Sequence, residues 1–297
     1  MSPFHGLSAF PLTPASSDGD IDVGRFGAMI SRIAAAGVGS IGVLGSTGGY
    51  AYLTREARLR AVEVAVHHAG HAVPVIAGVG ALRTEWAVDL ARDAAKAGAD
   101  GLLLAPMSYL PLTEDEVFAG FLAVAEATDL PLCIYNNPTT TRFAFSDHLI
   151  TRLAEVKTIV SVKMPLPANL DFSGELQRLR GFVPADFSIG YSGDWGAADS
   201  LLAGGDAWFS VVAGLLPDQA LRLTRAAMSG NIEKARRLDD AFQPLWTLFR
   251  TFGSFRVMYM IGDILGLEPG SPPRPILPLP AAQRPQVEAA VATVLDL

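Results

Sequence analysis

The sequence predicts an α/β protein, a (β/α)₈ TIM barrel with a C-terminal helical extension. Short apolar runs rich in β-formers recur along the chain, and their starts lie roughly 20 to 35 residues apart, the length of a strand plus a covering helix. The runs are almost entirely apolar rather than alternating, as in a parallel sheet that is buried on both faces. The predicted strands span residues 6–11, 38–45, 73–78, 101–106, 132–136, 158–163, 187–191 and 207–212.

Helical patterns with recognisable ends lie between these runs. Gly37 and Gly98 each follow an alanine-rich segment, and glycine tolerates the left-handed conformation that closes a helix. Thr54 precedes a further helical pattern, and Thr113 with Glu116 has the spacing of a capping box. A doubly wound open sheet is the competing architecture, but eight strand–helix units of similar length favour the closed barrel.

The strand pattern stops after about residue 217, and the remaining chain is predicted to be helical. Helices are expected over residues 218–229, 232–248, 255–265 and 281–295, with a proline-rich connector over 270–280. The first of these helices completes the barrel. We therefore expect a catalytic barrel over residues 1–225 and a C-terminal helical region over residues 226–297.

Composition excludes several classes of protein. Half of the 297 residues are apolar and 18% are charged, which is too apolar for a disordered chain. The net charge of −7 argues against nucleic acid or a membrane surface as a partner, and no apolar run has the roughly 18 residues of a membrane span. Residues 1–10 show no secretory signal, so a cytoplasmic enzyme is expected.

The lysines give the first indication of chemistry because the chain contains only four of them. Lys163 ends an apolar predicted strand, and the carboxyl ends of barrel strands surround the active site. A lysine withdrawn from water in this way can act as a neutral amine that attacks carbonyls. The alternative is a lysine that extends to the barrel rim. The other three lysines stand at ordinary solvated positions: Lys96, Lys157 and Lys234.

Two neighbouring motifs fit imine chemistry. Tyr135 ends the preceding predicted strand, where its hydroxyl can reach the Lys163 amine and both donate and accept a proton. The loop of residues 45–49, Gly-Ser-Thr-Gly-Gly, offers hydroxyls and backbone amides to a carboxylate. The alternatives are a packed aromatic residue at the strand end and a merely flexible loop. Further along, Asp194 is expected either to orient substrate hydroxyls or to cap the next helix.

Other motifs indicate structure rather than chemistry. Gly37, Gly39 and Gly42 match a dinucleotide fingerprint literally, but they run from a helix into a strand, which is the reverse of the required order. His67 and His71 have the spacing of a metal pair but lack a third ligand, so no metal site is expected.

Taken together, the motifs resemble the dihydrodipicolinate synthase/N-acetylneuraminate lyase superfamily of class I, imine-forming pyruvate enzymes. The resemblance spans almost the whole chain in one order. It implies that Lys163 forms the Schiff base with a 2-oxo acid, that Tyr135 relays protons, and that Ser46 assists the relay and the carboxylate. It also implies a homo-oligomer, a tetramer or dimer. The expected substrate-binding residues are Thr47, Gly48, Tyr109, Thr140, Arg142, Asp194, Ser210 and Val211.

Departures from the family pattern bear on the substrate. Gly49 stands where many relatives carry glutamate, and Thr140 stands where synthases carry an arginine, with Arg142 displaced by two positions. The second synthase tyrosine is also absent from its position, and Tyr109 lies one residue beyond. Without the arginine, the bidentate clamp for a second carboxylate is missing.

We therefore expect a carbon–carbon lyase or aldolase that acts on pyruvate or a longer 2-oxo acid, with a sugar-derived substrate and a dehydration step as open variants. The alternatives are 4-hydroxy-tetrahydrodipicolinate (dihydrodipicolinate) synthase and a non-catalytic 2-oxo-acid-binding protein. No cofactor is expected, because the lysine itself activates the substrate.

Overall fold

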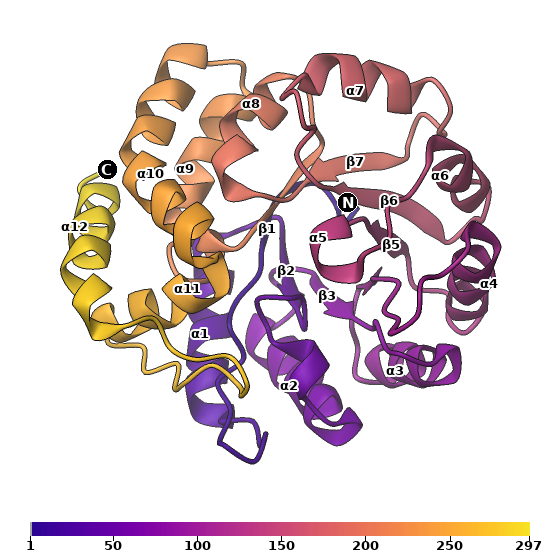
Figure 1. Cartoon of the computed structure of the whole chain (residues 1–297), viewed down its shortest axis with the longest axis horizontal. Coiled ribbons are helices and arrows are strands. Elements are labelled where there is room, and N and C mark those ends of the chain that lie inside the picture. Colours follow the sequence, from indigo (N-terminus) through magenta and orange to yellow (C-terminus); the bar gives the residue numbers. More distant parts are fainter. Residues whose placement is uncertain (1) are drawn as a thin grey trace.

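The computed structural model describes residues 2–297 and confirms the predicted barrel. All strands are parallel and follow one another in chain order, and β1 pairs with both β2 and β8, so that the sheet closes (Figure 1). Every strand overlaps a run predicted from the sequence. The strands are β1 (Gly6–Ala9), β2 (Ser40–Val43), β3 (Val75–Gly78), β4 (Gly101–Leu104), β5 (Leu132–Tyr135), β6 (Ile159–Met164), β7 (Ser188–Tyr191) and β8 (Ala207–Ser210).

Helices cover the outside of the barrel, and their ends follow the predicted signals. Gly37 closes α1 with φ of 73°, and Thr113 and Glu116 form the capping box of α4. The barrel helices are α1 (Val23–Ala36), α2 (Arg55–Ala69), α3 (Thr84–Lys96), α4 (Glu114–Ala125), α5 (Pro138–Thr141), α6 (Asp147–Ala154), α7 (Phe172–Arg180), α8 (Ala197–Leu202) and α9 (Pro217–Met228). Short 3₁₀ turns are η1 (Tyr50–Tyr52), η2 (Asp194–Gly196), η3 (Val212–Gly214) and η4 (Ala281–Gln283).

Three helices form the C-terminal region: α10 (Ile232–Phe252), α11 (Ser254–Ile264) and α12 (Arg284–Leu295). They lie together on one side of the barrel, where α10 packs on α8 and α9 (Figure 1). The division expected at residues 225/226 falls inside α9, so the last barrel helix continues slightly beyond it. Within residues 2–297, no helix is both long enough and apolar enough to cross a membrane.

The expected α10 boundary at residue 248 is too early. The helix contains Pro244 and continues to Phe252, and Gly253 ends it with φ of 82°. Conversely, the last predicted helix begins later than expected, because residues 281–283 form the 3₁₀ turn η4. Pro285 then stands in the first turn of α12, where its missing amide hydrogen costs no helical hydrogen bond. Both changes concern helix ends and leave the architecture unaltered.

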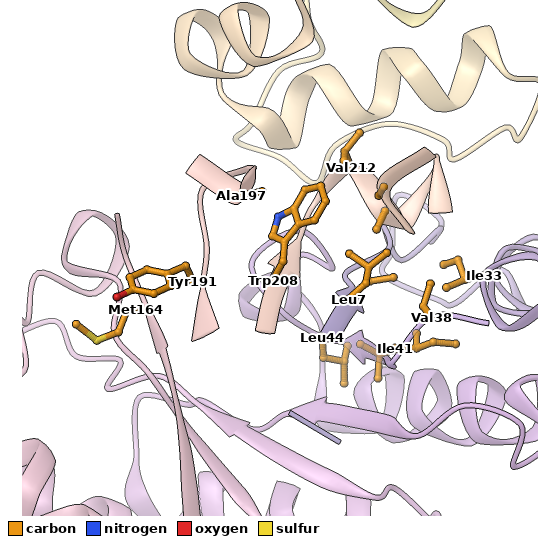
Figure 2. Packing of buried hydrophobic residues seen from close by; sticks show 14 of the residues in the cluster. Leu7, Ile33, Val38, Ile41, Leu44, Met164, Tyr191, Ala197, Trp208 and Val212 are labelled. Atoms are coloured by element: carbon orange, nitrogen blue, oxygen red, sulfur yellow. The ribbon is translucent and has the colours of Figure 1, made fainter. Parts of the chain in front are cut away.

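The barrel strands bury side chains on two faces. Leu7 of β1 and Ile41 of β2 face the helices and pack near Ile33 of α1 (Figure 2). The alternate side chains fill the barrel interior as a second apolar cluster, which includes Phe10, Ile76, Leu103, Cys133, Tyr135 and Phe209. Double burial explains why the strands read as continuous apolar runs. Because successive side chains of a strand point to opposite faces, every second residue reaches the interior of the barrel.

Candidate active site

Lys163 and Tyr135 are neighbours at the carboxyl end of the barrel. The register of β5 and β6 pairs the two residues directly. Tyr135 belongs to the interior cluster, and Lys163 shares that face with Ser161 because the two lie two positions apart on β6. Tyr135 is 5% exposed and Lys163 is 4% exposed. The structure thus brings together the two residues predicted to carry imine chemistry.

Aromatic rings surround the amine. The Lys163 Nζ atom lies 4.0 Å from the ring centroid of Phe10, 4.3 Å from that of Tyr135 and 5.5 Å from that of Phe209. Two glycines leave space for these rings. A Cβ atom on Gly42 would lie 2.3 Å from Phe10, and one on Gly190 would lie 2.6 Å from Phe209. Gly42 is therefore needed to leave room for the Phe10 ring near the amine. This role differs from that of a glycine in a dinucleotide-binding loop.

The Tyr135 hydroxyl is the centre of a hydrogen-bond network. Its Oη atom lies 3.1 Å from Ser46 Oγ and accepts a hydrogen bond of 2.9 Å from Asn137 Nδ2. Burial raises the pKa of Tyr135, but the positive charge of Lys163 and the bonds with Ser46 and Asn137 outweigh it, so that the net pKa is lowered. The lowered pKa makes the phenol a better group for exchanging protons with a bound substrate.

A cavity of about 690 Å³ opens above the amine. Lys163, Tyr135, Ser46 and Thr47 line it. The expected substrate-binding residues that also line this cavity are Thr140, Asp194 and Val211. The cavity therefore joins the polar loop after β2 to the ends of β5, β6, β7 and β8, as the barrel topology requires.

Two expected binding residues are buried behind this cavity and do not line it. A Cβ atom on Gly48 would lie 3.0 Å from both Leu44 N and Thr13 Oγ1, so the loop turns tightly there. The Ser210 Oγ atom accepts a hydrogen bond of 3.1 Å from Ala213 N and holds the start of η3. Both residues therefore support the loops that shape the site.

Tyr109 and Arg142 do not reach the cavity. The Tyr109 side chain is 94% exposed, and it lies in the loop that follows β4. Arg142 is exposed and ends α5 in the left-handed conformation, with φ of 56°. Neither side chain lines the cavity that contains Lys163 in this single chain.

Asp194 is buried and fully engaged with the protein. Its carboxylate accepts hydrogen bonds from Trp208 Nε1 at 3.0 Å, from Val211 N at 3.1 Å and from Val212 N at 2.7 Å. Burial raises its pKa to about 6, although these donors oppose the shift. The amides that it caps belong to the turn after β8 and not to the helix that follows it in sequence. Asp194 thus ties the ends of β7 and β8 together at the cavity edge.

Three residues of the site were not singled out from the sequence. Asn137 follows the strand that ends at Tyr135, and its side-chain amide donates a hydrogen bond to the phenol. Phe10 and Phe209 were assigned to strands, but their proximity to Lys163 depends on glycines in neighbouring strands. Among residues 2–297, no group of three or more His, Cys, Asp or Glu side chains is arranged to hold a metal ion.

A parallel eight-stranded barrel that buries a strand-end lysine against a tyrosine is the architecture of the class I aldolase-type lyases. Comparison with known proteins places the chain within this class. Residues 3–294 match the model of the dihydrodipicolinate synthetase family, and the protein belongs to that family.

Relatives and solved structures agree with this assignment. The chain is 33% identical over 285 residues to a 4-hydroxy-tetrahydrodipicolinate synthase of Laribacter hongkongensis, covering 94% of this chain and 95% of the relative. It is 35% identical over 283 residues to the enzyme of the same name from Thiobacillus denitrificans, covering 94% and 93%. A crystal structure described as dihydrodipicolinate synthase from Agrobacterium tumefaciens is 59% identical, with a TM-score of 0.97 and 98% of both chains covered.

Proposed function

We propose that Lys163 forms a Schiff base with pyruvate or a longer 2-oxo acid, and that the enzyme makes or breaks a carbon–carbon bond next to the imine. The observation that carries the proposal is the buried pair of Lys163 and Tyr135, whose hydroxyl lies 3.1 Å from Ser46 Oγ. A nucleophile beside a group that moves protons is what imine formation requires.

In the condensation direction, the neutral amine attacks the keto carbon, and the resulting carbinolamine loses water to give the protonated imine. The methyl group of pyruvate then loses a proton, and its electrons form an enamine. The enamine carbon attacks an aldehyde, whose oxygen takes up a proton. Water finally hydrolyses the imine and releases a 4-hydroxy-2-oxo acid and the free amine. Tyr135 moves the protons in these steps, with Ser46 and Asn137 bound to its hydroxyl.

The substrate carboxylate binds at the loop after β2. Ser46 and Thr47 present hydroxyls to the cavity, and Val211 lies on its opposite side after β8. Small residues in the loop allow backbone amides to approach an anion closely. These hydrogen bonds act at short range, so the loop can bind a carboxylate although the net charge of the protein is −7.

Reduction with borohydride tests the proposal. Incubation with pyruvate and sodium borohydride should add one reduced pyruvate to the protein, and peptide mass spectrometry should locate it at Lys163. Lys163→Ala should abolish the label, whereas Lys157→Ala is the matched control and should retain it. A label on another lysine, or none on the folded wild-type protein, would disprove the mechanism.

A second candidate is 4-hydroxy-tetrahydrodipicolinate synthase, which the names of the relatives favour. In that reaction the enamine condenses with aspartate semialdehyde. Measuring this condensation directly decides between the candidates, because Arg142 does not line the Lys163 cavity and its absence there predicts slow turnover. Turnover comparable with the best aldehyde in a panel would establish the synthase.

We propose that residues 1–225 form the catalytic barrel and that residues 226–297 complete its cavity. Phe249 of α10 and Phe255 of α11 line the cavity that contains Lys163. The helical region therefore contributes a wall of the site as well as covering α8 and α9. Truncation before α10 should leave a protein that no longer forms the pyruvate adduct.

We also propose that the protein is a homo-oligomer, a dimer or tetramer. Large apolar side chains are exposed around the ends of β2, β3 and β4, as expected for a surface covered by a second copy. They are Tyr52, Leu82, Trp86, Tyr109 and Leu110. Light scattering should give the mass of two or four chains, and Leu110→Glu should lower it. A monomer at micromolar concentration would contradict this proposal.

A cytoplasmic location completes the proposal. Fractionation of the native host should recover the enzyme with cytoplasmic markers.

A further inference from the structure

Large apolar side chains line much of the Lys163 cavity beyond the polar loop, together with the hydroxyls of Thr139, Ser192 and Ser254. Leu166 and Leu170 from the loop after β6 and Trp195 after β7 form its outer part, and Phe249 and Phe255 close it from the C-terminal helices. Leu170 is 58% exposed and Trp195 is 38% exposed. Large apolar side chains at a cavity mouth favour a ligand that covers them.

The same lining offers no cation to a second carboxylate. Among the lining residues in the described chain, the charged side chains are Lys163 and Asp194. Lys163 is consumed in the imine, and the Asp194 carboxylate is already bound by three donors. Arg142 is exposed and lies outside the lining. A carboxylate on the distal part of the substrate would therefore lose water without gaining an ion pair.

An adjoining cavity of about 410 Å³ has the same character. It shares Ser46, Thr140 and Phe255 with the Lys163 cavity, so the two are contiguous. Tyr50, Leu82 and Ile276 contribute to its lining, and within residues 2–297 no acidic, basic or histidine side chain does. Apart from Lys163 and Asp194, the side chains that line the two cavities are uncharged, and many of them are apolar.

We propose that the fragment this site adds to or removes from the 2-oxo acid is uncharged and apolar, an aryl or alkyl aldehyde, held against Leu166, Leu170 and Trp195. This inference rests on the proposed Schiff-base function and specifies its second substrate. In the cleavage direction, the bond between C3 and C4 breaks, its electrons form the enamine, and the C4 hydroxyl loses its proton as the aldehyde leaves.

Cleavage of three matched substrates tests the inference, with released pyruvate measured in the same coupled assay. The substrates are 4-hydroxy-2-oxo-4-phenylbutanoate, 4,5-dihydroxy-2-oxopentanoate and 4-hydroxy-2-oxoglutarate, which differ in whether the distal fragment is apolar, hydroxylated or anionic. The phenyl substrate should have a kcat/KM at least tenfold above both others. A wild-type preference for the anionic or the hydroxylated fragment would overturn the inference.

The three substrates differ in intrinsic reactivity, and comparing two variants with the same substrates cancels that difference. Leu170→Arg places a cation at the cavity mouth and should shift the phenyl-to-anionic ratio of kcat/KM toward the anion by at least tenfold. The matched control is Ile232→Arg, because Ile232 is 62% exposed at the end of α10 remote from Phe249. The control should leave the ratio unchanged. An equal ratio in both variants would show that the wall does not contact the fragment.

Borohydride trapping with pyruvate alone distinguishes a failure of the apolar-fragment inference from a failure of the Schiff-base function. Trapping at Lys163 in the wild type and both variants, together with an unshifted ratio, would refute the apolar wall and leave the Schiff-base function standing. Loss of trapping in the wild type would refute both.

Discussion

Removal of the Tyr135 hydroxyl is the sharpest perturbation of the site. Tyr135→Phe keeps the ring that contacts Lys163 and deletes an oxygen with two hydrogen-bond partners, Ser46 and Asn137. At about 0.5–1.5 kcal/mol for each bond, the free energy of unfolding should fall by about 1–3 kcal/mol. For a chain of this size, that loss lowers Tm by only about 2–6 °C, so the variant remains folded.

The chemical effect should be much larger than the effect on stability. A positioned group that transfers protons contributes about 10²–10⁴-fold to rate, and Tyr135 is the phenol adjacent to the amine. The assay is exchange of the pyruvate methyl protons in D₂O, followed by proton NMR, which needs no second substrate. Exchange by Tyr135→Phe should slow by that factor, while borohydride still labels Lys163.

Tyr259→Phe provides the control, because Tyr259 is buried in α11 and lines neither cavity. It should exchange protons at the wild-type rate. If Tyr135→Phe also exchanges within about threefold of wild type, the assignment of proton transfer to Tyr135 is refuted.

Three further predictions concern other parts of the barrel. Gly42→Ala should cost about 1–3 kcal/mol, because its methyl group would lie 2.3 Å from the buried Phe10 ring; an unchanged urea midpoint would contradict this. The raised pKa of Asp194 means that the native state holds this proton more tightly than the unfolded chain, so its contribution to stability falls as pH rises through about 6. Between pH 5 and 8, the free energy of unfolding of the wild type should fall by about 1 kcal/mol relative to that of Asp194→Asn. If denaturant titrations show the same difference between the two proteins at every pH, the raised pKa is refuted. Burial raises the pKa of Cys133 to about 12, so iodoacetamide should label it only after unfolding, and rapid native labelling seen by mass spectrometry would show that the thiol is accessible.

The barrel and its reactive pair were predictable because both follow from local patterns. Apolar runs of regular spacing gave the strands, and the position of Lys163 at a strand end placed it at the mouth of the barrel. Tyr135 ends the preceding strand, and the β5–β6 register brings the two together. Neighbouring strands in chain order are neighbours in the barrel, so no long-range information was needed.

Other features depend on packing that no local pattern contains. The exposure of Tyr109 and Arg142 depends on loop conformations, whereas the family resemblance fixed only their positions in the sequence. The carboxylate of Asp194 is bound by groups of β8 and its following turn, which are remote in the sequence. The rings beside Lys163 depend on the absence of side chains at Gly42 and Gly190, and a glycine in a strand does not reveal which ring fills its space.

The aromatic surroundings of the amine have an electrostatic consequence. Once the imine is protonated, its nitrogen is a cation, and the faces of Phe10, Tyr135 and Phe209 attract positive charge through their quadrupoles. An acidic side chain in the same place would stabilise that cation more strongly, but it would also repel the carboxylate of the incoming 2-oxo acid. Ring faces carry no net charge, so the site can support a cationic intermediate and still admit an anionic substrate.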